Sequence, residues 1–471
     1  MQADPRPIAP SHAEWWRPRP VASRAVLPRA VSSVRSQGRR SAVPFAALAC
    51  FTFVLLLAPQ VRFPVLAPLH LAALAAVVAI GAHLWDRARH REPIIVGRRE
   101  VWLAVALVAW SLMTAPFSYW PGGSIALLFG VYLKSVAVFW LLGAVIDTRT
   151  KLRQLAWALT ALAVPLAATA VWNFASGAFI GGGAHQEVER IIGYEAPLTT
   201  NPNDLALMLN LLLPLTVALF LIHRKPLIRA TLIAAIALDV VAVVATFSRA
   251  GFLTMATVLA GYFWKLRRRP ERIWAYGALG AGLLCLSLLP SGYLVHLGTI
   301  TNISSDPTGS AQARWSDTVT AARYVLMNPI FGAGLGMNVL ALNDARGATW
   351  RSVHNVYLEY AADLGLPGLL MFLLLLAGCV AGVGSVQRRL QATSAARDLF
   401  YLAEGVQLSL AGFAVAAFFH PVSYHFYFYY LAGLAIAVRN LSTRETNQEA
   451  TPRPPSWAHS TQALRLVGRA G

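Results

Sequence analysis

The segment RSVHNVYLEYAADLGLPGLLMFLLLLAG, which runs from Arg351 to Gly378, joins two different kinds of sequence. Its second half is a run of Leu and Phe that is apolar enough to lie in lipid. Its first half contains polar and ionisable residues, namely His354, Asn355, Tyr357, Glu359, Tyr360 and Asp363. The segment therefore predicts a membrane-spanning helix that is preceded by a polar mouth, and a polar mouth at the membrane surface indicates a functional site.

The composition of the whole chain is that of a membrane protein. Of its 471 residues, 56% are hydrophobic and only 13% are charged, whereas charged residues make up about a quarter of a soluble chain. Apolar runs of membrane-spanning length occur about twelve times, at 43–58, 64–84, 101–116, 124–146, 154–175, 203–222, 227–246, 251–266, 273–289, 366–386, 399–419 and 424–439. Because the alternating pattern of membrane β-barrels is absent from the sequence, these runs should be helical.

The predicted fold is an all-α integral membrane protein with about 12 transmembrane helices and a moderate periplasmic helical loop domain. The expected organisation is a disordered basic cytoplasmic arm at 1–42, transmembrane helices 1–9 at 43–289, a periplasmic loop region at 290–365, transmembrane helices 10–12 at 366–440 and a cytoplasmic tail at 441–471.

The basic residues give the orientation. Of the 40 Lys and Arg residues, 32 lie on one alternating set of connecting segments and termini, and seven lie on the other. Because cytoplasmic segments are enriched in Lys and Arg, the N- and C-termini should be cytoplasmic. The net charge of +19 then reflects segments that face anionic membrane lipids, and the scattered basic residues do not indicate a nucleic-acid partner.

Three separate segments bring candidate site residues to the outer side. Arg190 lies in the outer loop at about 176–202, Arg249 in the tight turn ATFSRAGFL, and His354 near the end of the longest outer loop, at about 290–365. Taken singly, an interfacial arginine is more often a lipid or loop contact, and a lone histidine is more often a satisfied residue at a helix end. Their convergence on one side of the membrane is what indicates a site.

The compartment limits the chemistry of such a site. Outside the inner membrane there is no ATP, so a bond-forming enzyme needs an activated substrate, and a sugar linked to a polyprenyl diphosphate is one. Guanidinium groups bind phosphate oxygens well and stabilise the charge on a departing diphosphate. A histidine with a pKa near neutrality can accept the proton of an attacking sugar hydroxyl.

Four other features have structural interpretations that compete with functional ones. Lys134 and Asp239 lie at matching depths within spans and predict either an ion pair or a functional role. The segment GAGLGMN at 332–338 lacks the preceding strand of a dinucleotide fingerprint and predicts a bent loop. His420 and His425 have no carboxylate or cysteine near them in sequence, so a metal site is not expected there. The three cysteines lie in apolar runs without metal-ligand spacing.

Several of these segments together resemble a known superfamily. RSVHNVYLEYAADLGLPGLL, following NPIFGAGLGMN after a long outer loop, resembles the characteristic motif of the O-antigen ligase and polymerase superfamily. RIIGYEAPLTTNPNDLALML and FSRAGFL resemble its two upstream arginine-bearing segments, and ARWSDTVTAARYVLMNP resembles the helix before the motif. The resemblance extends over roughly residues 40–440 in architecture and is specific in these short motifs.

The resemblance implies an inverting glycosyltransferase, independent of metals and cofactors, that takes a glycan from undecaprenyl diphosphate in the periplasm. It implies that Arg190 and Arg249 hold the donor diphosphate and that His354 acts as a base or orients the acceptor. Arg314, Asn355, Tyr357 and Glu359 are further candidate contacts. The basic outer loop favours lipid A-core as the acceptor, as in an O-antigen ligase, over the growing glycan of a polymerase or the protein hydroxyl of an O-oligosaccharyltransferase.

A function of another class is a transporter or flippase. About twelve spans and the intramembrane charges Lys134 and Asp239 would suit transport. However, transporter folds are commonly built from repeated halves, and the two halves of this chain show no convincing repeat. The long outer loop with its histidine favours surface chemistry instead.

Overall fold

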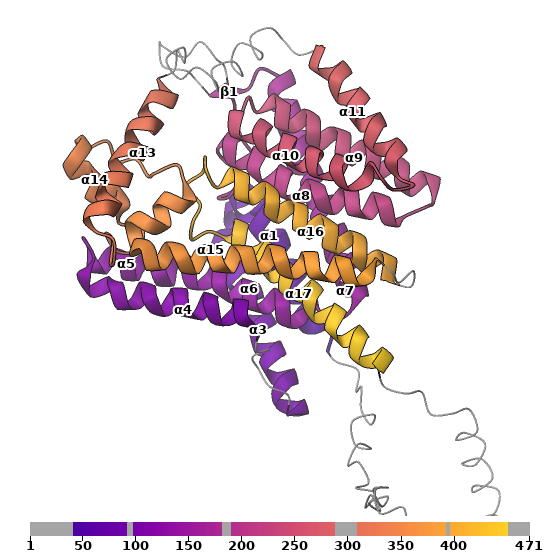
Figure 1. Cartoon of the computed structure of the whole chain (residues 1–471), viewed down its shortest axis with the longest axis horizontal. Coiled ribbons are helices and arrows are strands. Elements are labelled where there is room, and N and C mark those ends of the chain that lie inside the picture. The colour runs from indigo at the N-terminus through magenta and orange to yellow at the C-terminus, as the bar shows by residue number, and fades with distance from the viewer. Residues whose placement is uncertain (1–40, 92–97, 181–189, 288–308, 392–395, 451–471) are drawn as a thin grey trace, which may run out of the picture. The chain divides into compact units, whose positions relative to one another are not determined.

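The computed structural model describes residues 41–91, 98–180, 190–287, 309–391 and 396–450. The helices and strands of these described residues lie in the unit Ala42–Gly471 (Figure 1). The α-helices are α1 (Val43–Leu57), α2 (Pro59–Arg62), α3 (Leu71–His90), α4 (Arg99–Thr114), α5 (Pro121–Leu127), α6 (Leu133–Val145), α7 (Arg149–Ala175), α8 (Pro202–Ile222), α9 (Pro226–Ala245), α10 (Arg249–Leu266), α11 (Arg272–Ser287), α13 (Ser310–Met327), α14 (Asn338–Arg346), α15 (Val356–Leu390), α16 (Arg397–Ala416) and α17 (Phe426–Ala450). The other elements are η1 (Pro64–Leu69), η2 (Ala115–Phe117), η3 (Leu128–Tyr132), β1 (Phe179–Ile180) and β2 (Arg190–Ile191).

The helices confirm an all-α membrane protein. Within the described ranges, eight helices are long and apolar enough to cross a membrane. All twelve apolar runs of the sequence coincide with helical structure, but those in α1, α10, α11 and α17 fall outside the eight. Beyond the helices, the described part of the chain contains only a small ribbon, in which β1 and β2 pair antiparallel with Ile180 opposite Arg190.

Helix α8 lies at the centre of the packing and contacts α7, α9, α10 and α16. Pro214 lies inside α8 and lacks the N–H that would continue the helix. Two neighbouring helices donate to carbonyl groups at this point: the hydroxyl of Ser409 to Leu211, and the hydroxyl of Tyr262 to Pro214, each at 2.7 Å. These two hydrogen bonds join α8 to α16 and to α10, so α8 is fixed between α10 and α16.

Helix α15 is broken where the sequence GLPG predicts a break. Gly365 has a φ of 69°, a left-handed conformation that favours glycine. The carbonyl groups of residues 362–364 accept hydrogen bonds from outside the helix, from the backbone N–H groups of Ala333 and Gly334 and from the ring N–H of Trp110, at 2.7, 2.8 and 2.8 Å. The break therefore provides the attachment point for the loop that precedes α14.

Substituting Gly365 by alanine should lower stability strongly. An added Cβ would lie 2.1 Å from the carbonyl oxygen of Ile330, and the left-handed φ adds about 1–2 kcal/mol of strain. We expect Gly365→Ala to lose at least about 2 kcal/mol of unfolding free energy, read as a lower melting temperature in detergent. Gly280→Ala in α11, where nothing lies within 4 Å, is the matched control. Equal melting of the two variants would contradict this account of the break.

The segment GAGLGMN forms the bent loop predicted from the sequence. Gly332, Gly334 and Gly336 have φ values of 66°, 92° and 73°, and no strand precedes them among the residues described between 309 and 331. Asn338, the first residue of α14, donates its backbone N–H and its side-chain amide to Asp363 Oδ1 at 2.7 and 3.0 Å. The loop is thus tied to α15 just before the break.

The carboxylate of Asp363 also joins the segment just before α17 to this loop. Tyr424, just before α17, donates its hydroxyl to Asp363 Oδ2 at 3.0 Å. The side-chain oxygen of Asn338 also accepts a hydrogen bond from the backbone N–H of Val353 at 3.4 Å. This contact fixes the residue next to His354. Figure 1 shows α13 and α14 together at one end of the long helices, where both contact α15.

Two expectations from the sequence need correction. Lys134 is exposed on α6, whereas Asp239 is buried in α9 with 2% of its surface exposed, and no ion pair joins these two described residues. Helix α17 continues to Ala450, so residues 441–450, which we assigned to the tail, are helical. The rest of the predicted tail, and the predicted arm apart from residues 41–42, lie outside the described residues.

Candidate functional site

Arg190 lies on strand β2 and is half-buried. Its Nη2 donates to the side-chain oxygen of Asn203 at 2.7 Å, while its Nε is buried without a hydrogen-bond partner. Asn203 lies in the first turn of α8, where its backbone N–H donates to the capping side chain of Asn201 at 2.8 Å. The N-terminus of α8 therefore holds the guanidinium group through a single side-chain amide.

Arg249 is the first residue of α10 and follows the tight turn predicted from the sequence. The turn is formed by Phe247, which has a φ of 51°, and by Ser248, which caps the helix by accepting the N–H of Gly251 at 3.1 Å. The side chain of Asn210 in α8 donates to the carbonyl of Gly251 at 2.9 Å. The start of α10, and Arg249 with it, is thus fixed against α8.

Arg314 and Arg249 act electrostatically on Arg190. The pKa of Arg190 is lowered to about 10, mainly by burial and then by the positive charges of Arg314 and Arg249, with Asp204 opposing the effect. Arg314 comes from α13, in the long outer loop. Strand β2 and helices α10 and α13 therefore contribute guanidinium groups to one cluster, which we call the arginine cluster (Arg190, Arg249 and Arg314). Concentrated positive charge in a partly buried place suits a multiply charged anion.

His354 lies within the electrostatic influence of this cluster. It is half-buried and precedes α15, and its Nδ1 is 3.1 Å from the carbonyl oxygen of Ser352. Burial and the positive charge of Arg314 lower its pKa to about 4, so the ring is neutral at pH 7. Because a carbonyl oxygen only accepts, the Nδ1 atom carries the proton in that hydrogen bond, and Nε2 keeps its lone pair. His354 is therefore in the tautomer that can accept a proton.

The remaining residues of the polar mouth have partners within the protein. Asn355 caps α15 by accepting the N–H groups of residues 357 and 358 at 3.0 and 3.1 Å. Tyr357 donates its hydroxyl to Ala414 O at 2.7 Å, and Glu359 is buried and accepts from Ser423 Oγ at 2.5 Å. Since α15 begins at residue 356, His354 precedes the helix.

The structure adds two residues that sequence reasoning did not place at the site. Asn203 holds Arg190 directly, and His420 lies close enough to His354 to contribute to the lowering of its pKa. The only signal for Asn203 was the capping pattern NPND at the start of α8. His420 had been considered only as a metal ligand with His425. The described residues contain no group of three or more His, Cys, Asp and Glu that could hold a metal ion.

The basic character of the outer loop is partly neutralised within the protein. Arg346 Nη1 lies 2.7 Å from Asp317 Oδ1, and Arg351 lies 3.5 Å from the same oxygen. Arg346 also donates to the carbonyl of Arg351. Two arginines of the basic outer loop are therefore paired with Asp317, whose side chain is almost fully buried.

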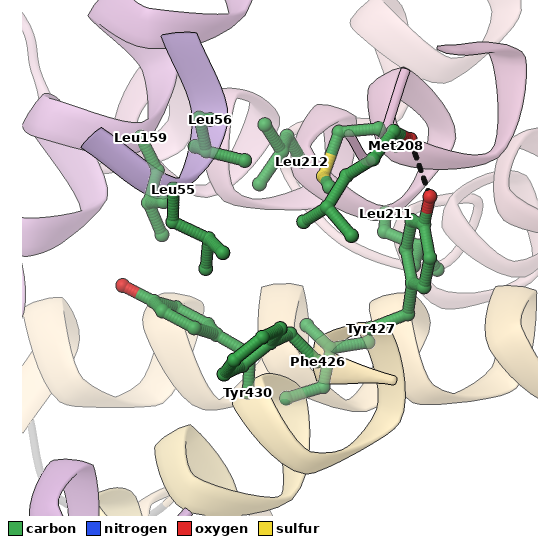
Figure 2. A pocket seen from close by; sticks show the side chains of 11 residues that line it. Leu55, Leu56, Leu159, Met208, Leu211, Leu212, Phe426, Tyr427 and Tyr430 are labelled. Atoms are coloured by element: carbon green, nitrogen blue, oxygen red, sulfur yellow. Dashed lines mark hydrogen bonds between the residues drawn. The ribbon is translucent and has the colours of Figure 1, made fainter. Parts of the chain in front are cut away.

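An apolar pocket adjoins the segment that carries Arg190. Its lining comes from α1, α7, α8, α17 and the loop before α8, and includes Leu55, Met208, Phe426 and Tyr430 (Figure 2). The hydroxyl of Tyr427 donates to the carbonyl of Leu198 in that loop. The hydroxyl of Tyr430 lies 2.9 Å from Thr52 Oγ1. Because both tyrosine hydroxyls have partners, the pocket presents an apolar surface.

The fold is that of an all-α membrane protein, and the arginine cluster concentrates positive charge at one place in it. A protein-family model described as O-antigen ligase matches residues 232–373 of this chain. This match supports the resemblance to the O-antigen ligase superfamily. The matched residues include Arg249, Arg314 and His354 but not Arg190. A search of curated proteins found no match.

Proposed function

We propose that this protein transfers an O-antigen glycan from undecaprenyl diphosphate to lipid A-core at the periplasmic face of the inner membrane. The match of residues 232–373 to the O-antigen ligase family model supports a glycosyl-transfer role on lipid-linked glycans at the level of the family. The observation that carries the more specific proposal is the arginine cluster beside a neutral His354. A diphosphate is an anion of suitable charge, and a neutral histidine is a suitable base for a sugar hydroxyl.

The proposed reaction is a single displacement at the anomeric carbon. The acceptor hydroxyl oxygen forms the new bond to this carbon, and the bond from the carbon to the diphosphate oxygen breaks. Nε2 of His354 takes the hydroxyl proton, and undecaprenyl diphosphate leaves with the bonding electron pair. The arginine cluster stabilises the negative charge that grows on the leaving diphosphate, because guanidinium groups retain their charge and are held in place before the reaction. The anomeric configuration is inverted.

Donor binding should also prepare His354 for its role. In the free protein the positive charge of Arg314 lowers the pKa of His354. A bound diphosphate brings negative charge to the same place and opposes that effect, so the pKa of His354 should rise towards its ordinary value. A stronger base is then present only when the donor is bound, which disfavours proton uptake in the empty site.

A second acceptor class remains a specific alternative. Asp317 pairs with Arg346 and Arg351, which weakens the argument from loop charge for the phosphorylated lipid A-core. A growing glycan, the acceptor of a polymerase, does not need positive charge on the loop in order to bind. Purified full-length protein in proteoliposomes, supplied with lipid-linked glycan and lipid A-core, separates these functions. Glycan joined to core supports a ligase, and chain growth supports a polymerase. The absence of both products would refute the proposed transfer and favour transport.

The proposed orientation places the arginine cluster in the periplasm and both termini in the cytoplasm. It predicts that a cysteine at Gly347, just after α14, reacts with an impermeant thiol reagent in cells whose outer membrane has been opened. A cysteine at Thr150, at the start of α7, should not react. Both positions are exposed in the structure, so burial does not explain a difference. The three native cysteines are first replaced by alanine, and the reverse labelling pattern would invert the topology.

The pH dependence of transfer should report on Arg314. His354 acts as a base only when neutral, so kcat/KM for the donor should fall as the pH drops through about 4. Arg314→Ala removes one of the charges that lower this pKa, so the acid limb should move to higher pH while burial keeps it below the ordinary value. Arg323→Ala, an exposed position on the same helix, should leave the limb in place. A limb that did not move in Arg314→Ala would argue against His354 as the titrating base.

A further inference from the structure

His420 lies between the end of α16 and the first turn of α8, where Asn203 holds Arg190. It lies between α16 and α17 and is buried, with 2% of its surface exposed. Its Nδ1 is 3.0 Å from the carbonyl oxygen of Ala416 at the end of α16. Its Nε2 is 3.3 Å from the carbonyl oxygen of Asn203 in the first turn of α8. Both partners can only accept, and burial lowers the pKa of His420, so the neutral ring has a single N–H and donates to only one of these two carbonyl oxygens.

The second of these contacts leads directly to the donor site. Asn203 accepts the Nη2 group of Arg190 on its side-chain oxygen at 2.7 Å. The Nε of Arg190 is buried and has no hydrogen-bond partner, so the bond to Asn203 largely determines how the guanidinium group is oriented. A displacement of the first turn of α8 would therefore move Arg190 relative to Arg249, which α10 supplies from another attachment.

We propose that His420 is a positioning residue for the donor diphosphate. In this proposal the neutral ring carries its proton on Nε2 and donates to the carbonyl of Asn203, which fixes the first turn of α8, and the Asn203 side chain then orients Arg190 within the arginine cluster. The inference rests on the proposed function, because it assumes that Arg190 binds the diphosphate. It assigns to the C-terminal segment FFHPVSYHF a role at a site whose other residues come from earlier in the chain.

Two conservative variants separate the contacts of the ring. The amide nitrogen of asparagine takes the place of Nδ1 and can reach Ala416, whereas that of glutamine takes the place of Nε2 and can reach Asn203. We expect His420→Asn to weaken binding of undecaprenyl diphosphate about five- to tenfold, the effect of one hydrogen bond, and to raise KM more than it lowers kcat. His420→Gln should restore binding to within about twofold. Full-length protein in nanodiscs is titrated with undecaprenyl diphosphate, and melting temperatures are measured in parallel.

A double-mutant cycle tests whether the effect passes through Arg190. If it does, His420→Asn should cost no further affinity in a protein that already carries Arg190→Ala. The inference is overturned if asparagine restores binding and glutamine does not, if both variants bind normally, or if the effects of the two substitutions simply add. Should His420→Asn fail to fold, Asn203→Ala tests the second link, and normal diphosphate binding by that variant would also overturn the inference.

The same experiments distinguish this inference from the proposed function. If Arg190→Ala alone binds undecaprenyl diphosphate normally, the assignment of the arginine cluster to the donor fails, and the role of His420 fails with it. If Arg190→Ala loses binding while His420→Asn keeps it, the donor site stands and only the positioning role is rejected.

Discussion

Replacing Arg190 by alanine should reduce glycan transfer about a hundred- to a thousandfold, because the loss of one preorganised charge contact at a developing anion has an effect of this size. Arg190 is half-buried and held by Asn203 before any substrate arrives, so its contact to the diphosphate requires little reorganisation. The variant should also bind undecaprenyl diphosphate more weakly. Both quantities are measured on full-length protein in proteoliposomes, and Arg249→Ala is expected to behave in the same way.

Two further substitutions make the result specific. Arg190→Lys keeps the positive charge but loses the planar group that contacts Asn203 and the substrate together, so it should recover only part of the activity. Arg323→Ala removes an exposed arginine from α13 and should have little effect. If Arg190→Ala and Arg323→Ala reduced transfer equally, a general loss of positive charge on the outer side would explain the result, and the arginine cluster would have no special role.

Replacing His354 by alanine should nearly abolish transfer while leaving donor binding intact. In the proposed reaction His354 takes the proton through Nε2, and it is not one of the arginine-cluster residues proposed to hold the diphosphate. Loss of a general base typically costs about a hundred- to ten-thousandfold in rate. Transfer rate and affinity for undecaprenyl diphosphate are measured on the same preparation, and His90→Ala, at an exposed position at the end of α3, serves as the control.

The two measurements assign the role of His354. A fall in kcat with unchanged binding is the pattern of an interaction made only in the transition state. Retention of more than about a tenth of the wild-type rate would be incompatible with general-base catalysis, and His354 would then be a residue that orients the acceptor. A loss of binding comparable to that of Arg190→Ala would place His354 in the diphosphate site instead.

Features that depend on local sequence were predictable. Apolar runs of spanning length identified the helices, because lipid allows no other backbone arrangement for them. The break at Gly365 followed from GLPG, and the turn before Arg249 followed from its short polar segment between two apolar runs. The capping role of Asn355 is also local, because its side chain accepts an N–H from two residues further along the chain. We had interpreted this residue as a possible substrate contact.

Features that depend on which side of a helix faces its neighbours were not predictable. Lys134 and Asp239 have matching depths, but depth does not determine which side of a helix faces a neighbour, and the two residues do not pair. The contact of His420 with Asn203 joins positions 217 residues apart, so no local pattern reveals it. The pairing of β1 with β2 was missed because two-residue strands leave no period-two pattern in the sequence.

The attachment of residues 333 and 334 to the broken segment of α15 limits how the protein can admit its substrates. If this loop lifted away, the carbonyl groups of Ala362 and Asp363 would lose their donors, and unbonded carbonyl groups in a dry environment cost several kcal/mol each, by an order-of-magnitude estimate. The loop is therefore a fixed rim and not a lid. Asn338 extends this rigidity to Val353, next to His354. In the proposed reaction, donor and acceptor would therefore meet an edge that is already in place, with no folding over of the protein there.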